Sequence, residues 1–190
     1  MGKKILAFAL LLFMAAAGTV SAQTFHLGLE GGANFASALG TDVGSVKSSM
    51  LGFVGGGFLE LNFGNSFAIQ PEVLYEQKGG QDSSGNQAVH LDYVEVPILF
   101  KLSLGTPGIN PAVFVGPAFN FNVLAQFTQS GNTSDITDAN SSDIGLVGGV
   151  EVALDKFFVS GRYELGLDNV SQNRNIQNGV ITLLVGYSFM

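Results

Sequence analysis

The chain contains neither cysteine nor tryptophan, and charged residues make up only 12% of its 190 positions. Without cysteine it can form no disulfide bond and offers no thiolate ligand to a metal. Globular domains average about 25% charged residues, and a fraction as low as this is therefore unusual for a soluble protein. Glycine and phenylalanine are abundant instead, with 26 and 16 residues.

Long apolar runs are also scarce, and the one at the N-terminus has the features of an export signal. Lys3 and Lys4 precede an uncharged apolar run over residues 5–17, and Val20 and Ala22 supply the small residues of a cleavage site. The run is shorter than the ~20 residues that a membrane-spanning helix needs. We therefore predict a signal peptide over residues 1–22 and a single mature domain over residues 23–190. No cysteine stands at the cleavage point to carry a lipid anchor.

Positive charge is scarce as well. Removal of Lys3 and Lys4 leaves 6 basic and 15 acidic residues, a formal net charge of −9. This acidity argues against a nucleic-acid partner, because phosphate binding needs a cationic surface. After the signal no apolar stretch approaches the length of a membrane-spanning helix. A closed β-barrel is the remaining membrane-compatible architecture, since its strands satisfy every backbone polar group.

Alternation with a period of two dominates the mature chain, as expected for strands with one apolar face. In the first segment Phe25, Leu27 and Leu29 share one face, and His26 and Glu30 share the other. Eight segments of about ten residues or more, long enough for a tilted strand to cross a bilayer, alternate in this way. They are Thr24–Ala36, Leu51–Phe63, Ser66–Gly79, Val89–Leu104, Ala112–Ala125, Asp143–Leu154, Phe157–Leu167 and Val180–Phe189.

The connections between these segments alternate in length. Four are long, polar and rich in Ser, Asn, Asp and Gly: Ser37–Met50, Gly80–Ala88, Phe127–Ser142 and Asp168–Gly179. Three are short and have turn residues: Gly64–Asn65, Gly105–Asn110 and Asp155–Lys156. Short turns on one side and long loops on the other are typical of outer-membrane barrels. Both chain ends then lie on the short-turn side, which we predict to face the periplasm.

A barrel in lipid turns its apolar residues outward, so the polar faces predict a charged lumen. The predicted lumen charges are Glu30, Glu60, Glu72, Glu76, Lys78, Glu95, Lys101, Glu151, Arg162 and Glu164. Side chains just fill the interior of an eight-stranded barrel, and buried charges are costly unless paired. We therefore predict an ion-paired plug in which Arg162, Lys101 and Lys78 each meet one or more glutamates. The alternative is a solute or proton path lined by the same groups.

The sequence contains only weak candidates for a catalytic or metal site. His90 and Asp92 lie two residues apart, but no nucleophile or third partner accompanies them. Asp135, Asp138 and Asp143 lack the alternating acids and central glycine of a calcium loop. We predict no catalytic, cofactor or metal site, and no enzymatic activity.

Four segments resemble the PorT-like, "porin family" group of small outer-membrane β-barrel domain proteins. Residues 91–101 (LDYVEVPILFK) resemble that family's Tyr-Leu-Glu-Ile-Pro-Leu-Leu-Leu-Lys strand, and residues 111–117 (PAVFVGP) its Pro-Tyr-Val-Phe-Ala-Gly-Pro strand. Residues 143–151 (DIGLVGGVE) and 162–170 (RYELGLDNV) resemble its Asp-x-Gly-x-x-x-Gly-x-Gly and Arg-Tyr-x-x-Gly-Leu-x-Asn-Ile segments. The resemblance extends over residues 25–190.

The resemblance implies an all-β fold, an eight-stranded antiparallel up-and-down transmembrane barrel of OmpA/OmpX-like architecture in the bacterial outer membrane. It implies little about activity, because only some members are tied to protein secretion machinery. Such barrels usually end on an aromatic residue that the barrel assembly machinery reads, whereas here Met190 follows Phe189.

The sequence is compatible with four functions. The first is a monomeric, non-enzymatic scaffold whose loops contact envelope, secretion or adhesion partners. The second is a narrow channel for ions or small solutes, the third a soluble lipocalin-like carrier in the periplasm, and the fourth an outer-membrane enzyme. The partners expected for the leading function are outer-membrane lipid, the barrel assembly machinery and envelope or secretion proteins.

Overall fold

The computed structural model describes residues 24–39, 48–81, 87–105, 109–129, 132–135, 142–167 and 177–189. The predicted signal peptide and the tips of the long loops lie outside these residues. None of the described residues belongs to a helix with the length and hydropathy needed to cross a membrane. The strands are β1 (Thr24–Leu39), β2 (Ser48–Phe63), β3 (Phe67–Gln81), β4 (Gln87–Ser103), β5 (Asn110–Gln129), β6 (Asn132–Asp135), β7 (Ser142–Leu154), β8 (Phe157–Gly166) and β9 (Gln177–Ser188).

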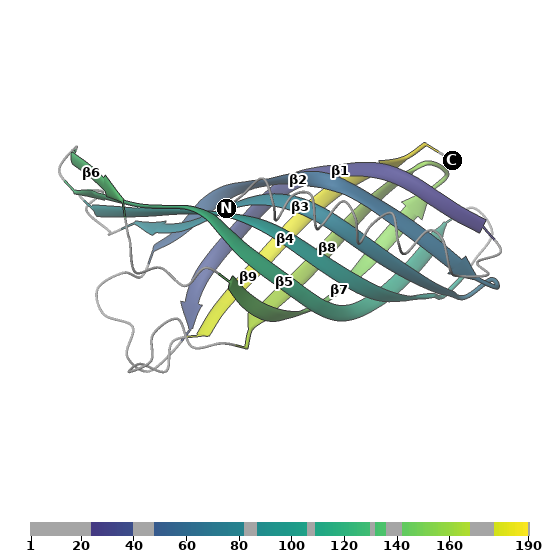
Figure 1. Cartoon of the computed structure of the whole chain (residues 1–190). Helices are drawn as coiled ribbons and strands as arrows, with labels where there is room; N and C mark the ends of the chain where they lie inside the picture. Colours follow the sequence, from purple (N-terminus) through teal and green to yellow (C-terminus); the bar gives the residue numbers. More distant parts are fainter. Residues whose placement is uncertain are drawn as a thin grey trace.

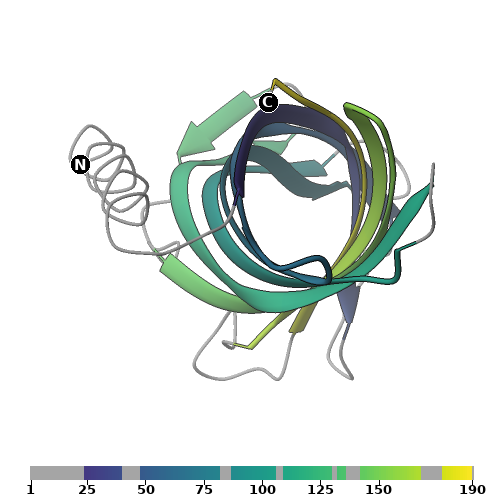
Figure 2. The same cartoon turned by 90° about the vertical axis from the view of Figure 1, so that its right-hand side faces the viewer.

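All strands except β6 form a closed antiparallel barrel (Figures 1 and 2). Each barrel strand pairs with the barrel strands next to it along the chain, and β1 pairs with β9 from Gly28↔Ser188 to Leu39↔Gln177 to close the ring. The predicted eight-stranded up-and-down barrel is confirmed. The strand boundaries differ from the predicted ones by a few residues.

The barrel is apolar outside and carries its buried charged residues inside. Along β8 the outward Val159 is 56% exposed, whereas the inward Ser160 is 1% exposed. Along β7 the outward Val150 is 58% exposed and the inward Glu151 only 7%. A soluble carrier of apolar ligands needs the opposite arrangement, so the lipocalin-like alternative is wrong.

The two ends of the barrel differ. Gly64–Ser66 and Asp155–Lys156 form tight turns at one end, which we call the short-turn end. The turns need residues that tolerate a positive φ, and Gly64 and Asp155 have φ values of 73° and 55°. The last described residue lies at the same end, because the Phe189 amide donates to the Leu27 carbonyl oxygen at 2.8 Å. The opposite end, where the chain passes through the four longer connections, is the long-loop end.

The prediction of an uninterrupted loop over Phe127–Ser142 is wrong. Strand β5 continues to Gln129, and β6 pairs with it from Gln126↔Asp135 to Gln129↔Asn132. This hairpin projects beyond the barrel wall at the long-loop end (Figure 1). Because it lies outside the apolar belt, its polar residues carry no period-two apolar pattern, so alternation could not predict a strand there.

Inward glycines allow neighbouring strands to approach closely. A Cβ atom built on Gly116 would lie 1.9 Å from the Ile98 carbonyl oxygen, which is far inside van der Waals contact. On the outer face, a Cβ atom on Gly31 would meet nothing nearer than the Val54 carbonyl oxygen at 3.5 Å. Glycine at position 116 is therefore a requirement of the tightly curved wall, and glycine at position 31 is not.

Candidate functional site

All ten predicted lumen charges project into the barrel. Eight are buried, and Glu60 and Lys78 are partly exposed. The seven glutamates among them are all the glutamates of the chain. A glutamate carries one more methylene group than an aspartate, so its carboxylate reaches further from the wall toward groups on other strands.

Arg162 on β8 lies in the middle of the lumen and joins three strands. Its Nη1 donates to Glu72 Oε2 on β3 at 2.7 Å, and its Nη2 donates to Glu30 Oε2 on β1 at 3.3 Å. Its guanidinium also lies over the Phe114 ring, with Cζ 5.6 Å from the ring centroid. The planar fork of arginine suits such a shared, buried pairing.

Lys101 on β4 forms the centre of a second cluster nearer the short-turn end. Its Nζ donates to Glu60 Oε2 at 2.6 Å and to Glu151 Oε1 and Gln70 Oε1 at 2.8 Å. Gln70 Nε2 in turn donates to Glu72 Oε1 at 2.8 Å. The Lys101 and Arg162 clusters are thus one continuous network.

A cavity of about 340 Å³ with polar and apolar lining residues opens at the short-turn end, and Lys101 is among the residues that line it. His26 and Asn62 line its wall and contact Glu60, with Asn62 Nδ2 donating to Glu60 Oε1 at 3.1 Å and His26 Nδ1 lying 3.3 Å from the same oxygen. We call this cavity the vestibule. Lys101 and the edge-to-face pair of Phe58 and Phe158 are among its lining residues.

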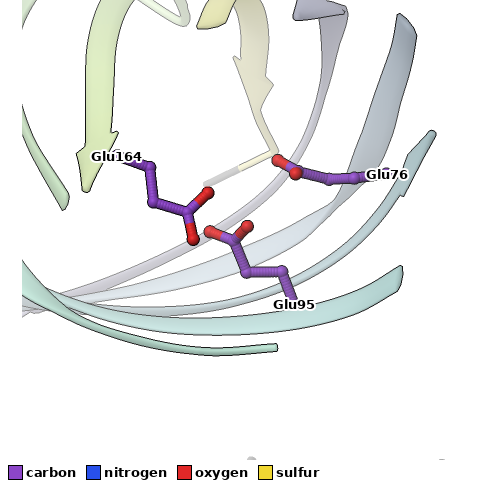
Figure 3. A group of neighbouring side chains, drawn as sticks. All are labelled: Glu76, Glu95 and Glu164. Atoms are coloured by element: carbon purple, nitrogen blue, oxygen red, sulfur yellow. The ribbon is translucent and has the colours of Figure 1, made fainter. Parts of the chain in front are cut away.

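Lys78 on β3 holds a third cluster toward the long-loop end. Its Nζ lies 2.9 Å from Glu76 Oε2, 3.2 Å from Glu95 Oε2 and 2.7 Å from Glu164 Oε2. The three carboxylates come from different strands and point toward one another (Figure 3). Their oxygens lie within 4.8 Å of one another, a spacing that could hold a metal ion, but the Lys78 ammonium already contacts all three.

The ten charges therefore fall into two networks. The short-turn network contains Glu30, Glu60, Glu72, Glu151, Lys101 and Arg162, together with His26, Asn62 and Gln70. The long-loop network contains Lys78, Glu76, Glu95, Glu164 and Asn120. Within the described part of the chain, no hydrogen bond or ion pair joins the two networks. Each network carries two more glutamates than lysines and arginines.

The sequence prediction missed the apolar residues that also face inward. Six of them are only 0–1% exposed: Val54, Leu74, Leu99, Ala118, Val147 and Leu184. The signal was present, because Leu74 has the same parity as Glu72 and Glu76, and Leu99 the same parity as Glu95 and Lys101. The six belong to two separate clusters: Leu99, Ala118 and Val147 pack with Phe114 on β4, β5 and β7, and Val54, Leu74 and Leu184 pack on β2, β3 and β9.

The other candidate residues do not assemble into a site. Asp92 accepts a hydrogen bond from the Tyr75 hydroxyl at 2.5 Å, on the face of β3 and β4 that points away from the lumen. The side chains of His90 and Asp135 and the whole of Asp138 lie outside what the structure describes. Asp143 lies on β7, paired in register with Asn120.

Solved structures of small outer-membrane barrels share this fold. Ail, the attachment invasion locus protein of Yersinia pestis, solved with the heparin analogue sucrose octasulfate, is 15% identical with a TM-score of 0.54. That alignment covers 87% of this chain and 99% of Ail. Neisserial surface protein A is also 15% identical, with a TM-score of 0.52, over 87% of this chain and 97% of its own. No curated protein matches the sequence.

A family match covers most of the chain and agrees with the inverted polarity of the barrel. Residues 21–172 match the outer membrane protein beta-barrel domain. The exposed apolar belt, the closed ring of strands and the charged interior are what a barrel in lipid requires. The chain is therefore a bacterial outer-membrane protein that belongs to the outer membrane protein beta-barrel domain family.

Proposed function

We propose that the chain is a non-enzymatic scaffold that is anchored by its barrel and presents its long-loop end to partners in the envelope or at the cell surface. The closed lumen is the observation that carries this proposal. Inward residues from one wall to the other, including Glu72, Leu99 and Val147, are 0–1% exposed. A water-filled path would wet at least one side of such residues, so the lumen geometry favours a plug over a channel.

The ion pairs that the charged lumen residues form argue against a catalytic role for these residues. Every lysine and arginine of the two networks contacts at least two carboxylates, which leaves the bases engaged in structural pairs. In the described residues, no serine or threonine hydroxyl is held by a histidine in the manner of an activated nucleophile. The barrel lumen therefore offers a rigid interior rather than a reactive one.

Within the family, we propose that the chain belongs to the PorT-like group. Three of the four segments that carry the resemblance supply lumen charges: Glu95 and Lys101 from residues 91–101, Glu151 from residues 143–151, and Arg162 and Glu164 from residues 162–170. The resemblance thus rests on residues that hold the barrel together. The resemblance therefore indicates the architecture of the barrel.

The charge of the predicted loops indicates the class of partner. The four long connections carry five aspartates and two bases: Asp42, Asp82, Asp135, Asp138 and Asp168 against Lys47 and Arg174. A polyanion such as the sulfated sugar seen with Ail would be repelled by this surface. We propose that the partner presents cationic or neutral polar groups.

Site-specific photocrosslinking in intact cells tests the scaffold function. A crosslinker at the exposed Thr133 on β6 should capture a discrete envelope or surface protein. The matched control is a crosslinker at the exposed Lys156 in the turn at the other end. Capture at position 156 alone, or a steady ionic current through the purified barrel, would contradict the proposal.

A further inference from the structure

The buried polar residues that line the vestibule already surround one ammonium group. Lys101 Nζ donates to Glu60 Oε2 at 2.6 Å, and it also donates to Gln70 Oε1 and Glu151 Oε1, both at 2.8 Å. The same nitrogen lies 6.0 Å from the centroid of the Phe158 ring. Oxygen acceptors together with an aromatic face suit an ammonium group. We call this part of the vestibule its inner end.

The inner end has more acceptor capacity than Lys101 uses. Glu151 is only 7% exposed, and among the described residues no hydrogen bond or ion pair engages its second carboxylate oxygen, Oε2. The carboxylates of Glu60 and Glu151 share one fixed positive charge there, that of Lys101. A carboxylate oxygen in this position favours a positively charged donor, because charge-assisted hydrogen bonds are the strong ones.

The other ionisable residues of the lining do not balance Glu151. Asp155 and Lys156 lie in the exposed turn at the mouth of the vestibule, and their opposite formal charges cancel. His26 Nδ1 lies 3.3 Å from Glu60 Oε1, and no contact joins His26 to Glu151 among the residues that the structure describes. The inner end therefore attracts cations.

The rest of the lining suits an aliphatic chain. The volume of about 340 Å³ lies within the range of small-molecule sites, roughly 300–1,000 Å³. The apolar lining residues include Phe58, Ala68, Ala112, Ala153 and Phe158. A bare metal ion would leave these apolar side chains unused, and an anion would face the excess of carboxylates. An organic cation matches both parts of the lining.

We propose that the vestibule binds a small aliphatic amine in its ammonium form, with the ammonium group against Glu151 Oε2 and the chain against the apolar lining. This site goes beyond the scaffold function, because it lies at the short-turn end and the scaffold's partners meet the long-loop end. In the predicted orientation the amine enters from the periplasm.

Calorimetric titration of the purified full-length barrel in a non-ionic detergent tests the class of ligand. The probes 5-amino-1-pentanol, 1,5-pentanediol and 5-hydroxypentanoate share one chain and differ only in the charge of one end. The amino alcohol alone should bind saturably. Equal binding of the diol, or no saturable binding of the amino alcohol, would overturn the proposal. Nα-acetyl-lysine amide identifies the source of the ammonium group: binding of both amines supports a lysine side chain of a periplasmic protein, and binding of the amino alcohol alone supports a free amine.

Two matched pairs of variants locate the site, each with its folding checked by heat-modifiable migration. Glu151→Gln keeps an acceptor for Lys101 but removes the charge, so the Kd for 5-amino-1-pentanol should rise about tenfold or more. Glu95→Gln, in the long-loop network, should leave the Kd unchanged. Ala153→Phe fills the vestibule and should abolish binding, whereas Val152→Phe, on the outer face of the same strand, should not. Undiminished binding to Glu151→Gln or to Ala153→Phe would overturn the proposal and leave the scaffold function intact.

Discussion

Arg162 Nη1 and Glu72 Oε2 lie 2.7 Å apart across the lumen, although the two residues are 90 positions apart in the chain. Both side chains are almost completely shielded from solvent, at 3% and 0% exposure. Removal of one partner of such a pair leaves the other charge buried without compensation. The pair therefore couples β3 to β8 more firmly than any surface contact could.

Loss of Arg162 should destabilise the barrel strongly. We expect Arg162→Met to lower the free energy of unfolding by about 3–5 kcal/mol, because Glu72 and Glu30 lose the one base that pairs with them among the described residues. Denaturant titration of the folded, heat-modifiable form measures the change. The exposed turn residue Lys156 is the control, and Lys156→Met should change little. If Arg162→Met with Glu72→Gln is no more stable than Arg162→Met alone, the buried-charge explanation is wrong.

Two glycine substitutions should have opposite outcomes. Gly116→Ala would place its Cβ atom 1.9 Å from the Ile98 carbonyl oxygen, so we expect loss of the folded band on unboiled gels. Gly31→Ala meets no atom closer than 3.5 Å, so the folded band should persist. Its stability should rise by up to about 1 kcal/mol, because alanine restricts the unfolded chain. Equal behaviour of the two variants would show that strand approach does not set the glycine requirement.

The predicted orientation places the long-loop end outside the cell. An impermeant maleimide added to intact cells should label Ser134→Cys on β6 and should not label Lys156→Cys in the turn at the opposite end. After lysis both positions should react, since both are exposed. The reverse pattern in intact cells would invert the topology.

Asp155 should tolerate glycine better than a branched side chain. Its φ of 55° lies in the left-handed region, where a Cβ-branched residue is unfavourable. We expect Asp155→Val to cost about 1–2 kcal/mol of stability and Asp155→Gly to cost little. Thermal unfolding, followed by the change in gel mobility, compares the two, and a larger loss for the glycine variant would refute the conformational explanation.

Sulfated polysaccharide should not bind at the long-loop end. The five loop aspartates outnumber the two loop bases, so a heparin column in low salt should fail to retain the purified barrel. Replacement of Asp82 and Asp138 by lysine should produce retention that salt reverses. Retention of the unsubstituted protein would indicate that a local cationic patch outweighs the loop charge.

Much of this architecture was predictable from the sequence. Lipid outside and packed side chains inside impose opposite polarities on alternate residues, so runs such as Phe157–Leu167 identify both a strand and its faces. The same alternation predicts that the ten lumen charges point into the barrel, because each lies on the polar face of its strand. Strand β6 could not be predicted from this alternation, because its residues lie outside the membrane belt and need no apolar face.

The choice of partners inside the lumen could not be predicted. Whether Arg162 meets Glu72 or Glu95 depends on strand tilt and stagger around the ring, which are properties of the closed barrel rather than of any one strand. Leu74 and Leu99 had the parity of inward residues. A polar-inside rule gives no reason to expect apolar residues there, and the division of the lumen into two networks emerged only from the structure.

The pairing of β1 with β9 has a consequence for the order of assembly. Arg162 on β8 and Glu30 on β1 lie on opposite sides of that seam, so they reach each other only when the first and last strands have joined. An unclosed sheet would hold an arginine and several glutamates without their partners at the edge of the bilayer, a costly state. Ring closure and charge neutralisation thus occur together, which makes the open intermediate short-lived and the final step of insertion strongly cooperative.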